Sequence, residues 1–373
     1  MNVKKYWRYL KEIVRYHLPM LLKVEWVRRF PASYSKVGFK PMAAALNITD
    51  RCNMQCIMCN SWQNTAPDDL KTEGWKDVLR QLKEQGVKVV GFIGGEPLLR
   101  RDVADLIAYA TSIGLQTSLT TSGYLLDEGR AHALVEAGVG SVTISIDGVG
   151  EQYESIRGRD YRRVERACEI LGKLKKEKGL YVIISFTLMK PTLEHFDAVK
   201  ALSERLDIPL NICLLDYSPY LFQVEENTKS FWIREGDMPR LRKIQESLVK
   251  AKESSGGRVL HPYVDIDFFP KYFQDPLQAK IPCAVSQHRV LIDSHGSVYG
   301  GCWSMGSYGS LCKQSLAEII ASKAYQEAHR KMFFKECPGC SCGYPITLRY
   351  SLPNQIKEGL FRVSKRMRDT IWS

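Results

Sequence analysis

Short apolar runs alternate with amphipathic stretches between residues 42 and 214. The apolar runs predict six strands, at residues 43–48, 87–93, 116–121, 141–146, 181–189 and 210–214. Apolar residues at three- and four-residue spacing predict helices between them, at residues 74–85, 101–113, 127–137, 161–178 and 193–206. Such alternation gives parallel strands joined by right-handed crossovers. The pattern predicts an α/β fold, an open barrel of six strand–helix units that binds ligands at the carboxyl ends of its strands.

The segments on either side of this barrel (42–214) have patterns of their own. Residues 1–41 predict a basic amphipathic helical extension, broken near Pro19, and residues 346–373 predict a basic C-terminal helix. Residues 215–280 are an aromatic-rich connecting segment with a charged helix near 238–252, and its aromatic residues either pack in a core or line an apolar substrate pocket. Residues 281–345 predict a small α+β C-terminal domain.

Composition narrows the setting of the protein. The 373 residues suffice for one large domain and a smaller one, and the chain has no run of 18 apolar residues and no signal peptide. Eleven cysteines are too many for an inert core and lack the framework of a small secreted protein. We therefore expect a reducing, cytoplasmic setting.

The net charge of +12 lies at the two ends of the chain. Residues 1–40 contribute +8 and residues 349–373 contribute +4, so the segment between them is neutral. Two interpretations of the basic ends stay open. They are helices docked on the protein, or helices that lie on an anionic membrane surface and attach the protein peripherally to the inner face of the membrane. A nucleic-acid partner is not expected, because no recognised binding module accompanies the charge.

Three cysteines lie close together just after the first predicted strand. Cys52, Cys56 and Cys59 are spaced four and three residues apart, and clustered thiolates favour zinc or iron–sulfur over calcium or magnesium. A structural zinc site needs a fourth ligand, but the nearest histidines are His17 and His132. Three thiolates suit a [4Fe–4S] cluster whose fourth iron takes an outside ligand. The alternative is three unconnected core cysteines.

This CxxxCxxC loop resembles that of the radical S-adenosylmethionine (SAM) enzymes, whose fold is a (β/α)6 partial TIM barrel. A second match is Gly94-Gly95-Glu96-Pro97 after the second strand, which is similar to the family's GGEP motif that bonds the SAM amino group. The resemblance implies that SAM binds the open iron and is cleaved by an electron to a 5′-deoxyadenosyl radical. It also implies a reducing partner such as flavodoxin or ferredoxin.

The same resemblance implies further SAM-binding residues at other strand ends. Ser145 and Asp147 lie in a stretch similar to the family's SxDG turn, and Arg157 is a candidate clamp for the SAM carboxylate. Met58 stands where the family usually has an aromatic residue beside the adenine. The alternative for each is a turn or cap residue. The full set is Met58, Thr121, Ser122, Ser145, Asp147 and Arg157.

A second group of cysteines lies in residues 281–345. Cys283 and Cys302 flank a predicted hairpin at 288–299, and a predicted helix at 315–332 precedes Cys337 and Cys340. The arrangement resembles the twitch domain, a shortened SPASM domain, of radical SAM enzymes, which implies one auxiliary [4Fe–4S] cluster with four thiolate ligands. Zinc is the alternative metal, and Cys342 the alternative to Cys340.

Cys213, at the end of the last barrel strand, and Cys312 are candidates to face the substrate and return a hydrogen atom to it. Cys168, in a predicted helix, is expected to be a small buried hydrophobic residue.

The resemblance implies a radical SAM oxidoreductase that abstracts hydrogen from an unactivated C–H bond, with the auxiliary cluster relaying electrons. A small molecule, sugar or lipid is the expected substrate, because 40 N-terminal residues are too few for a peptide leader-binding domain. The alternatives are an epimerase or C–C bond-forming enzyme, a maturase of ribosomal peptides, and a non-catalytic iron–sulfur or zinc protein that binds nucleic acid.

Overall fold

The computed structural model describes residues 18–64, 70–216, 229–255, 259–276, 283–334 and 336. The predictions for residues 1–17, the C-terminal helix at 346–373, Cys337, Cys340 and Cys342 lie outside these residues.

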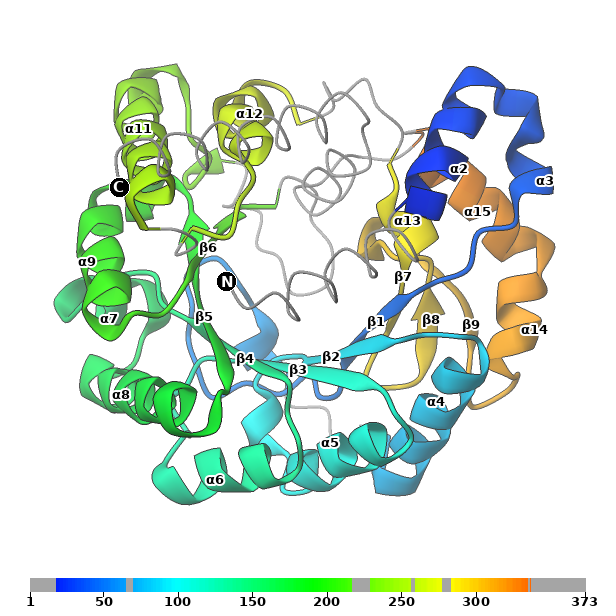
Figure 1. Cartoon of the computed structure of the whole chain (residues 1–373), viewed down its shortest axis with the longest axis horizontal. Coiled ribbons are helices and arrows are strands. Elements are labelled where there is room, and N and C mark those ends of the chain that lie inside the picture. Colours follow the sequence, from blue (N-terminus) through cyan, green and yellow to red (C-terminus); the bar gives the residue numbers. More distant parts are fainter. Residues whose placement is uncertain are drawn as a thin grey trace, which may run out of the picture.

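Six parallel strands form the centre of the sheet, in the order β6-β5-β4-β3-β2-β1. The strands are β1 (Ala43–Asn47), β2 (Val89–Ile93), β3 (Gln116–Thr121), β4 (Ser141–Ser145), β5 (Tyr181–Leu188) and β6 (Leu210–Leu214). The helices between them are α4 (Thr72–Glu84), α5 (Val103–Ser112), α6 (Glu128–Glu136), α7 (Glu151–Arg157), α8 (Tyr161–Lys178) and α9 (Phe196–Leu206). They cover the outside of the curved sheet (Figure 1). The predicted α/β partial barrel is confirmed.

The core is built from buried side chains at every second position of the strands and from apolar side chains along one face of each helix. In β3, every second side chain is buried, and Phe92 of β2 and Ile144 of β4 are fully buried. Helix α4 turns Trp75, Val78, Leu79 and Leu82 toward the sheet. Cys168 is buried in α8, as expected for a small hydrophobic residue.

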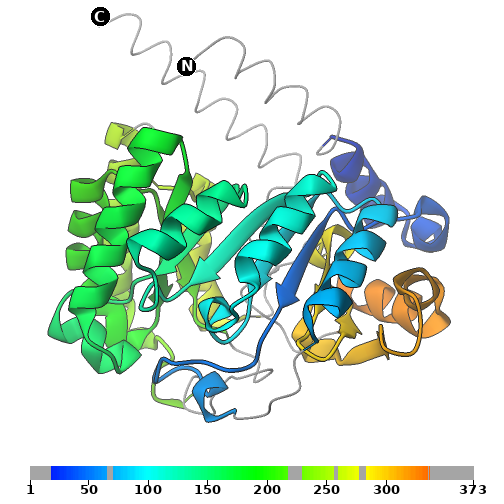
Figure 2. The same ribbon diagram turned by 90° about the horizontal axis from the view of Figure 1, so that it is seen from below.

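The C-terminal hairpin continues the barrel sheet. Strand β7 (Arg289–Ile292) pairs parallel with β1, β8 (Ser297–Tyr299) pairs antiparallel with β7, and β9 (Ser307–Ser310) completes a nine-stranded sheet. Figure 2 shows these strands beside β1. The segment that carries Cys302 is therefore attached directly to the strand that leads into the three-cysteine loop.

The prediction of a single helix at 315–332 is wrong. Two helices, α14 (Leu316–Ala321) and α15 (Lys323–Phe333), meet at Ser322. Ser322 has extended backbone angles, and its hydroxyl accepts a hydrogen bond from the amide of Tyr325 at 3.2 Å. Serine is a favoured N-cap, so it starts a new helix here.

The connecting segment is largely helical. It contains α11 (Met238–Ser255) and α12 (Tyr263–Gln274), joined by a hydrogen bond from the Gln245 side chain to the carbonyl of Ile266. The described aromatic residues Trp232, Tyr272 and Phe273 are buried against one another, so they pack in a core rather than line a pocket.

The described part of the N-terminal extension is docked on the protein. Helix α2 (Leu18–Arg29) is followed by the short helices η2 (Pro31–Ser33) and α3 (Tyr34–Val37), and its inner face packs against Ala284, just before α13 (Val285–His288), and Phe333 of α15. None of the described helices is long and apolar enough to cross a bilayer.

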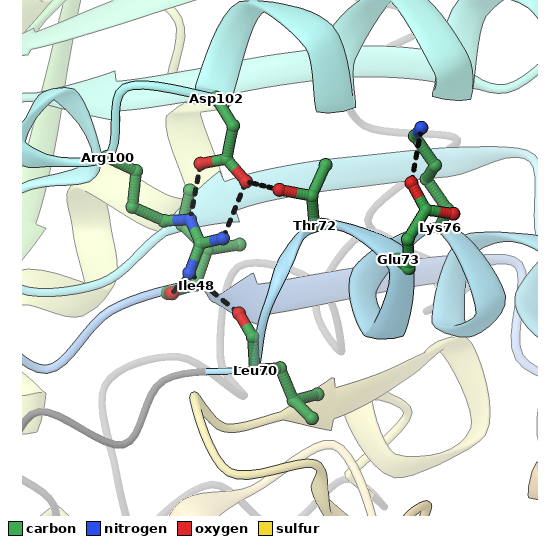
Figure 3. A network of polar contacts seen from close by, with 7 residues as sticks. All are labelled: Ile48, Leu70, Thr72, Glu73, Lys76, Arg100 and Asp102. Atoms are coloured by element: carbon green, nitrogen blue, oxygen red, sulfur yellow. Dashed lines mark hydrogen bonds and ion pairs between the residues drawn. The ribbon is translucent and has the colours of Figure 1, made fainter.

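A buried ion pair holds together the loops that carry the two sequence motifs (Figure 3). The Arg100 guanidinium donates to both carboxylate oxygens of Asp102, at 3.0 and 2.7 Å, and to the carbonyls of Ile48 and Leu70. The Thr72 hydroxyl also donates to Asp102, at 2.6 Å. Burial opposes ionisation of Asp102, but Arg100 and Thr72 together lower its pKa. The end of β1 is thus fixed to the starts of α4 and α5.

Candidate cofactor site

The three-cysteine loop follows β1 and is fastened to the end of α7. The amides of Gln55 and Ile57 donate to the carbonyls of Arg157 and Ile156, at 3.1 and 3.0 Å. Gly158 ends α7 in the left-handed region (φ +68°), where a Cβ atom would press on Gln55. The carbonyls that a helix leaves unpaired at its C-terminus therefore set the path of the loop.

The Gly94–Gly95 segment lies against the same loop. The amides of Gly95 and Glu96 donate to the carbonyls of Thr49 and Arg51, at 2.8 and 2.9 Å. A Cβ atom on Gly94 would collide with the Thr49 carbonyl, and one on Gly95 with the Arg51 carbonyl. Only glycine permits this approach of two backbones.

Glu96 is fully buried behind the glycines, and its carboxylate is saturated by the protein. One oxygen accepts from the Thr121 hydroxyl at 2.7 Å and the Leu98 amide at 3.1 Å. The other accepts from the amide and the hydroxyl of Ser122, at 2.8 and 2.6 Å. Glu96 therefore fixes the turn after β3, and its four acceptor positions are used.

A second buried carboxylate positions Arg157. Asp147 is fully buried, and its Oδ2 lies 2.5 Å from Nη2 of Arg157, while its Oδ1 accepts from the Thr187 amide at 2.6 Å. Nη1 of Arg157 lies 3.5 Å from the sulfur of Cys56. Burial opposes the charge of Arg157, but Asp147 and Cys56 raise its pKa above the ordinary value. The guanidinium is therefore a fixed cation beside a thiol.

These elements surround a cavity of about 290 Å³ at the carboxyl ends of the strands. The structure brings eleven of the predicted residues into its lining: Cys52, Cys56, Met58, Cys59, Gly94, Gly95, Thr121, Ser122, Ser145, Arg157 and Cys213. Glu96 and Asp147 lie behind the wall, and Pro97 starts the buried turn η4 (Pro97–Leu99).

The sequence analysis missed Thr187 and Asp216, which also line the cavity. Both lie at or just after the end of a parallel strand, and that position was the signal that could have found them.

Cys213 has polar neighbours at the cavity edge. Its sulfur is 3.1 Å from the Ser185 hydroxyl and 3.3 Å from the side-chain amide of Asn211. Cys312, by contrast, does not line this cavity. It is exposed, and its thiol donates to the carbonyl of His295 at 3.6 Å.

The three loop thiols fit an iron–sulfur cluster. Burial raises the pKa of Cys52 to about 12 and also raises the pKa values of Cys56 and Cys59, so these thiols need a bound cation to become thiolates. Among the described residues, no three His, Cys, Asp or Glu side chains converge tightly enough to hold a single metal ion. The three thiols line one cavity and could together hold a multi-iron cluster.

The auxiliary site is described in part. The amide of Cys283 donates to the carbonyl of Phe333 at 3.0 Å, and Cys302 starts the short helix η7 (Trp303–Met305). Both cysteines are half-buried.

Polar contacts link the start of the three-cysteine loop to the C-terminal hairpin. Asp50 accepts from the side-chain amide of Asn47 at 2.6 Å, and its other carboxylate oxygen is 3.4 Å from Nε2 of His295. Burial raises the pKa of Asp50. Asp293, at the end of β7, accepts from the hydroxyl of Tyr299 at 3.1 Å.

Comparison with known families gives two matches along the chain. A sequence model described as the radical SAM superfamily matches residues 46–202, and one described as an iron–sulfur cluster-binding domain, SPASM, matches residues 283–343.

Curated relatives match in part. A PqqA peptide cyclase of Bradyrhizobium diazoefficiens is 31% identical over 61% of this chain and 59% of its own length. An Fe-coproporphyrin III synthase of Methanosarcina barkeri is 33% identical over 45% of this chain and 42% of its own length. The chain therefore spans about three fifths of the first relative and less of the second.

Solved structures share the fold. Streptococcus suis SuiB bound to S-adenosylmethionine has a TM-score of 0.63 and 16% identity over 82% of this chain and 72% of its own. The anSMEcpe structure with bound AdoMet and Cp18Cys peptide has a TM-score of 0.60 and 20% identity, over 88% and 98% of the two chains.

Proposed function

Because the chain belongs to the radical SAM superfamily and carries a SPASM-type domain, with SAM and two [4Fe–4S] clusters as cofactors, we propose that it is a maturase that modifies a peptide substrate.

The names of the PqqA peptide cyclases and of the solved structures support a peptide over the small molecule, sugar or lipid that we expected from the sequence, whereas the name Fe-coproporphyrin III synthase points to a small molecule. PqqA peptide cyclases from two organisms match this chain, at 31% and 42% identity. Two proteins of the same fold have been solved with peptides, SuiB with the precursor peptide SuiA and anSMEcpe with Cp18Cys peptide. The match to PqqA peptide cyclase over 235 residues is the observation that carries the proposal.

In this proposal Cys52, Cys56 and Cys59 hold the first cluster. When bound, the cluster and SAM supply reductive cleavage of SAM and abstraction of a hydrogen atom from the substrate. Arg157, held by Asp147, places a fixed positive charge in the cavity wall, where it would bind the SAM carboxylate.

Glu96 acts through its neighbours rather than on SAM directly. It aims the hydroxyls of Thr121 and Ser122, which in turn form part of the cavity wall. Met58 lines the same cavity and would pack beside the adenine of SAM. Ser145 and Thr187 line the remainder of the cavity and offer hydrogen bonds to SAM or to a peptide backbone.

The auxiliary cluster would be held by four cysteines, Cys283, Cys302, Cys337 and Cys340. It would exchange electrons with the substrate. Cys213 lies in the cavity wall, where its thiol would face the bound peptide.

The test follows hydrogen transfer without requiring the product to be known. The reconstituted full-length protein is incubated anaerobically with SAM, dithionite and one of three uniformly deuterated pools: a peptide library containing the PqqA peptide, a lipid extract, or a low-molecular-weight metabolite extract. Mass spectrometry then measures deuterium in the 5′-deoxyadenosine released. We expect deuterium only with the peptide pool, and none with the Cys56→Ala variant. Deuterium from only the lipid or metabolite pool would refute the peptide assignment.

A further inference from the structure

Helix α2 presents a row of large apolar side chains to solvent. Four side chains at four-residue spacing lie on the side of the helix opposite its docked face: Leu18, Leu22, Trp26 and Phe30, with exposed fractions of 40, 60, 55 and 49%. Phe30 continues the helical pattern by donating from its amide to the carbonyl of Trp26. We call these four residues the α2 stripe.

The α2 stripe is not ordinary surface. Seven large apolar side chains are exposed among the described residues, and four of them lie in this one row. The ring centroids of Trp26 and Phe30 are 4.6 Å apart, so these two side chains form one apolar surface. Isolated exposed apolar residues are normal, whereas a contiguous row marks a surface that binds something.

The opposite face of α2 is already in use. Met20, Leu21, Val24 and Val27 are buried against the protein, together with Ala284 and Phe333. The helix therefore cannot turn its stripe inward without losing this packing. Figure 1 shows α2 at an outer corner of the molecule, next to α15, with the curved sheet and its outer helices on the other side.

Basic residues border the α2 stripe. Lys23, Arg28 and Arg29 belong to the helix. The Lys23 ammonium donates to the carbonyl of Gly38 at 2.8 Å, and the one acidic residue of the helix, Glu25, is 2.8 Å from Arg28 in an ion pair. Arg29 is exposed at the end of the stripe. Aromatic and leucine side chains with a Lys/Arg border are the composition of a helix that lies in the interface of an anionic bilayer.

We propose that the α2 stripe docks on an anionic lipid surface. The helix lies flat, with Leu18, Leu22, Trp26 and Phe30 among the acyl chains near the headgroups and the exposed Arg29 against lipid phosphates. Helix α2 packs on Phe333, the last residue of α15, and the carbonyl of Phe333 accepts a hydrogen bond from the amide of Cys283. Binding of α2 to lipid would therefore fix the auxiliary domain relative to that surface.

Charge favours lipid over a second copy of this chain. Two copies that met through this face would bring together two basic segments, each with five Lys/Arg and one Glu, a net charge of +4, over residues 18–40. An anionic bilayer neutralises the same charges and attracts each nearby Lys or Arg.

The experiment is flotation of the full-length holoprotein with vesicles under anaerobic conditions. Vesicles contain phosphatidylcholine with about one quarter phosphatidylglycerol, or phosphatidylcholine alone. The test variant, Leu22→Gln/Trp26→Gln, keeps charge and helix propensity but removes apolar surface. The control, Tyr181→Gln, removes a similarly exposed aromatic (47%) at the start of β5.

We expect the wild type and Tyr181→Gln to float with the anionic vesicles, less so as salt rises. The double variant should partition about a hundredfold less, since burying one large apolar side chain changes an equilibrium about tenfold or more. SAM cleavage, measured on the same samples, should be equal in all three proteins, which separates this proposal from the proposed function.

Three results would overturn the proposal. The first is wild-type protein that does not float with anionic vesicles, and the second is a double variant that floats as well as wild type. The third is a wild-type dimer in light scattering that the double variant converts to a monomer without any vesicle binding, because a second copy would then cover the stripe.

Discussion

The pair of Asp147 and Arg157 gives the sharpest test of how the cavity wall is built. Asp147 is fully buried and the Arg157 side chain is only 13% exposed, so neither charge is well solvated by water. Removing one partner of such a pair leaves the other charge buried and costs about 3–5 kcal/mol. We expect both Arg157→Met and Asp147→Asn to lower the free energy of unfolding by about this amount.

The double variant distinguishes an ion pair from two independent packing contributions. Without either charge, the side-chain oxygen introduced by Asp147→Asn can still accept from the Thr187 amide, and the loss is limited to its unpaired neutral NH2 group, at roughly 1–3 kcal/mol. Asp147→Asn/Arg157→Met should therefore be no less stable than either single variant. Anaerobic urea unfolding of the reduced, metal-free protein, followed by far-UV circular dichroism, measures all four proteins. Single effects that simply add in the double variant would refute the reasoning.

Three further variants test single features. Gly95→Ala places a methyl group against the carbonyl of Arg51, so iron bound at the three-cysteine loop should fall. Gly172→Ala is the control, because a Cβ there would meet nothing and the backbone is not in the left-handed region, and it should retain the iron; equal iron contents in the two variants would contradict the close approach. Glu96→Gln replaces an acceptor oxygen with a donor and should cost about 3 kcal/mol or more in urea unfolding, because two hydrogen bonds to a buried charge are lost; an effect under about 1 kcal/mol would contradict it. Burial lowers the pKa of His329 to about 3, so the unfolded chain takes up a proton below pH 6.5 that the folded protein does not. Between neutral pH and pH 5.5, the free energy of unfolding of the wild type should therefore fall by about 1.4 kcal/mol more than that of His329→Phe. If the free energies of unfolding of the two proteins change in parallel with pH, this prediction is wrong.

The barrel and the placement of its two motifs were predictable because they follow from local patterns. Apolar runs marked the strands, and the rule that parallel strands end on one edge was enough to bring the cysteine loop, Gly94 and Ser145 to one cavity. The role of each lining residue stays a prediction.

Other features depend on contacts between distant segments. The pairing of β7 with β1 joins residues more than 240 positions apart, and no local pattern encodes it. The hydrogen bonds that the turn after β3 donates to the Glu96 carboxylate join segments about 25 residues apart, and the motif alone does not reveal them; the role of Glu96 at SAM stays a prediction. The break at Ser322 was missed because apolar spacing continues across it, although serine as an N-cap was a readable signal.

The most direct test of the central claim is an iron count combined with a SAM cleavage assay. The protein is reconstituted anaerobically, iron and sulfide are measured, and cleavage is followed under dithionite, beside Cys52→Ala/Cys56→Ala/Cys59→Ala. The account predicts about eight irons in the wild type and about four in the triple variant, with cleavage lost. Equal iron contents in the two proteins, or cleavage that survives without the three thiols, would contradict it.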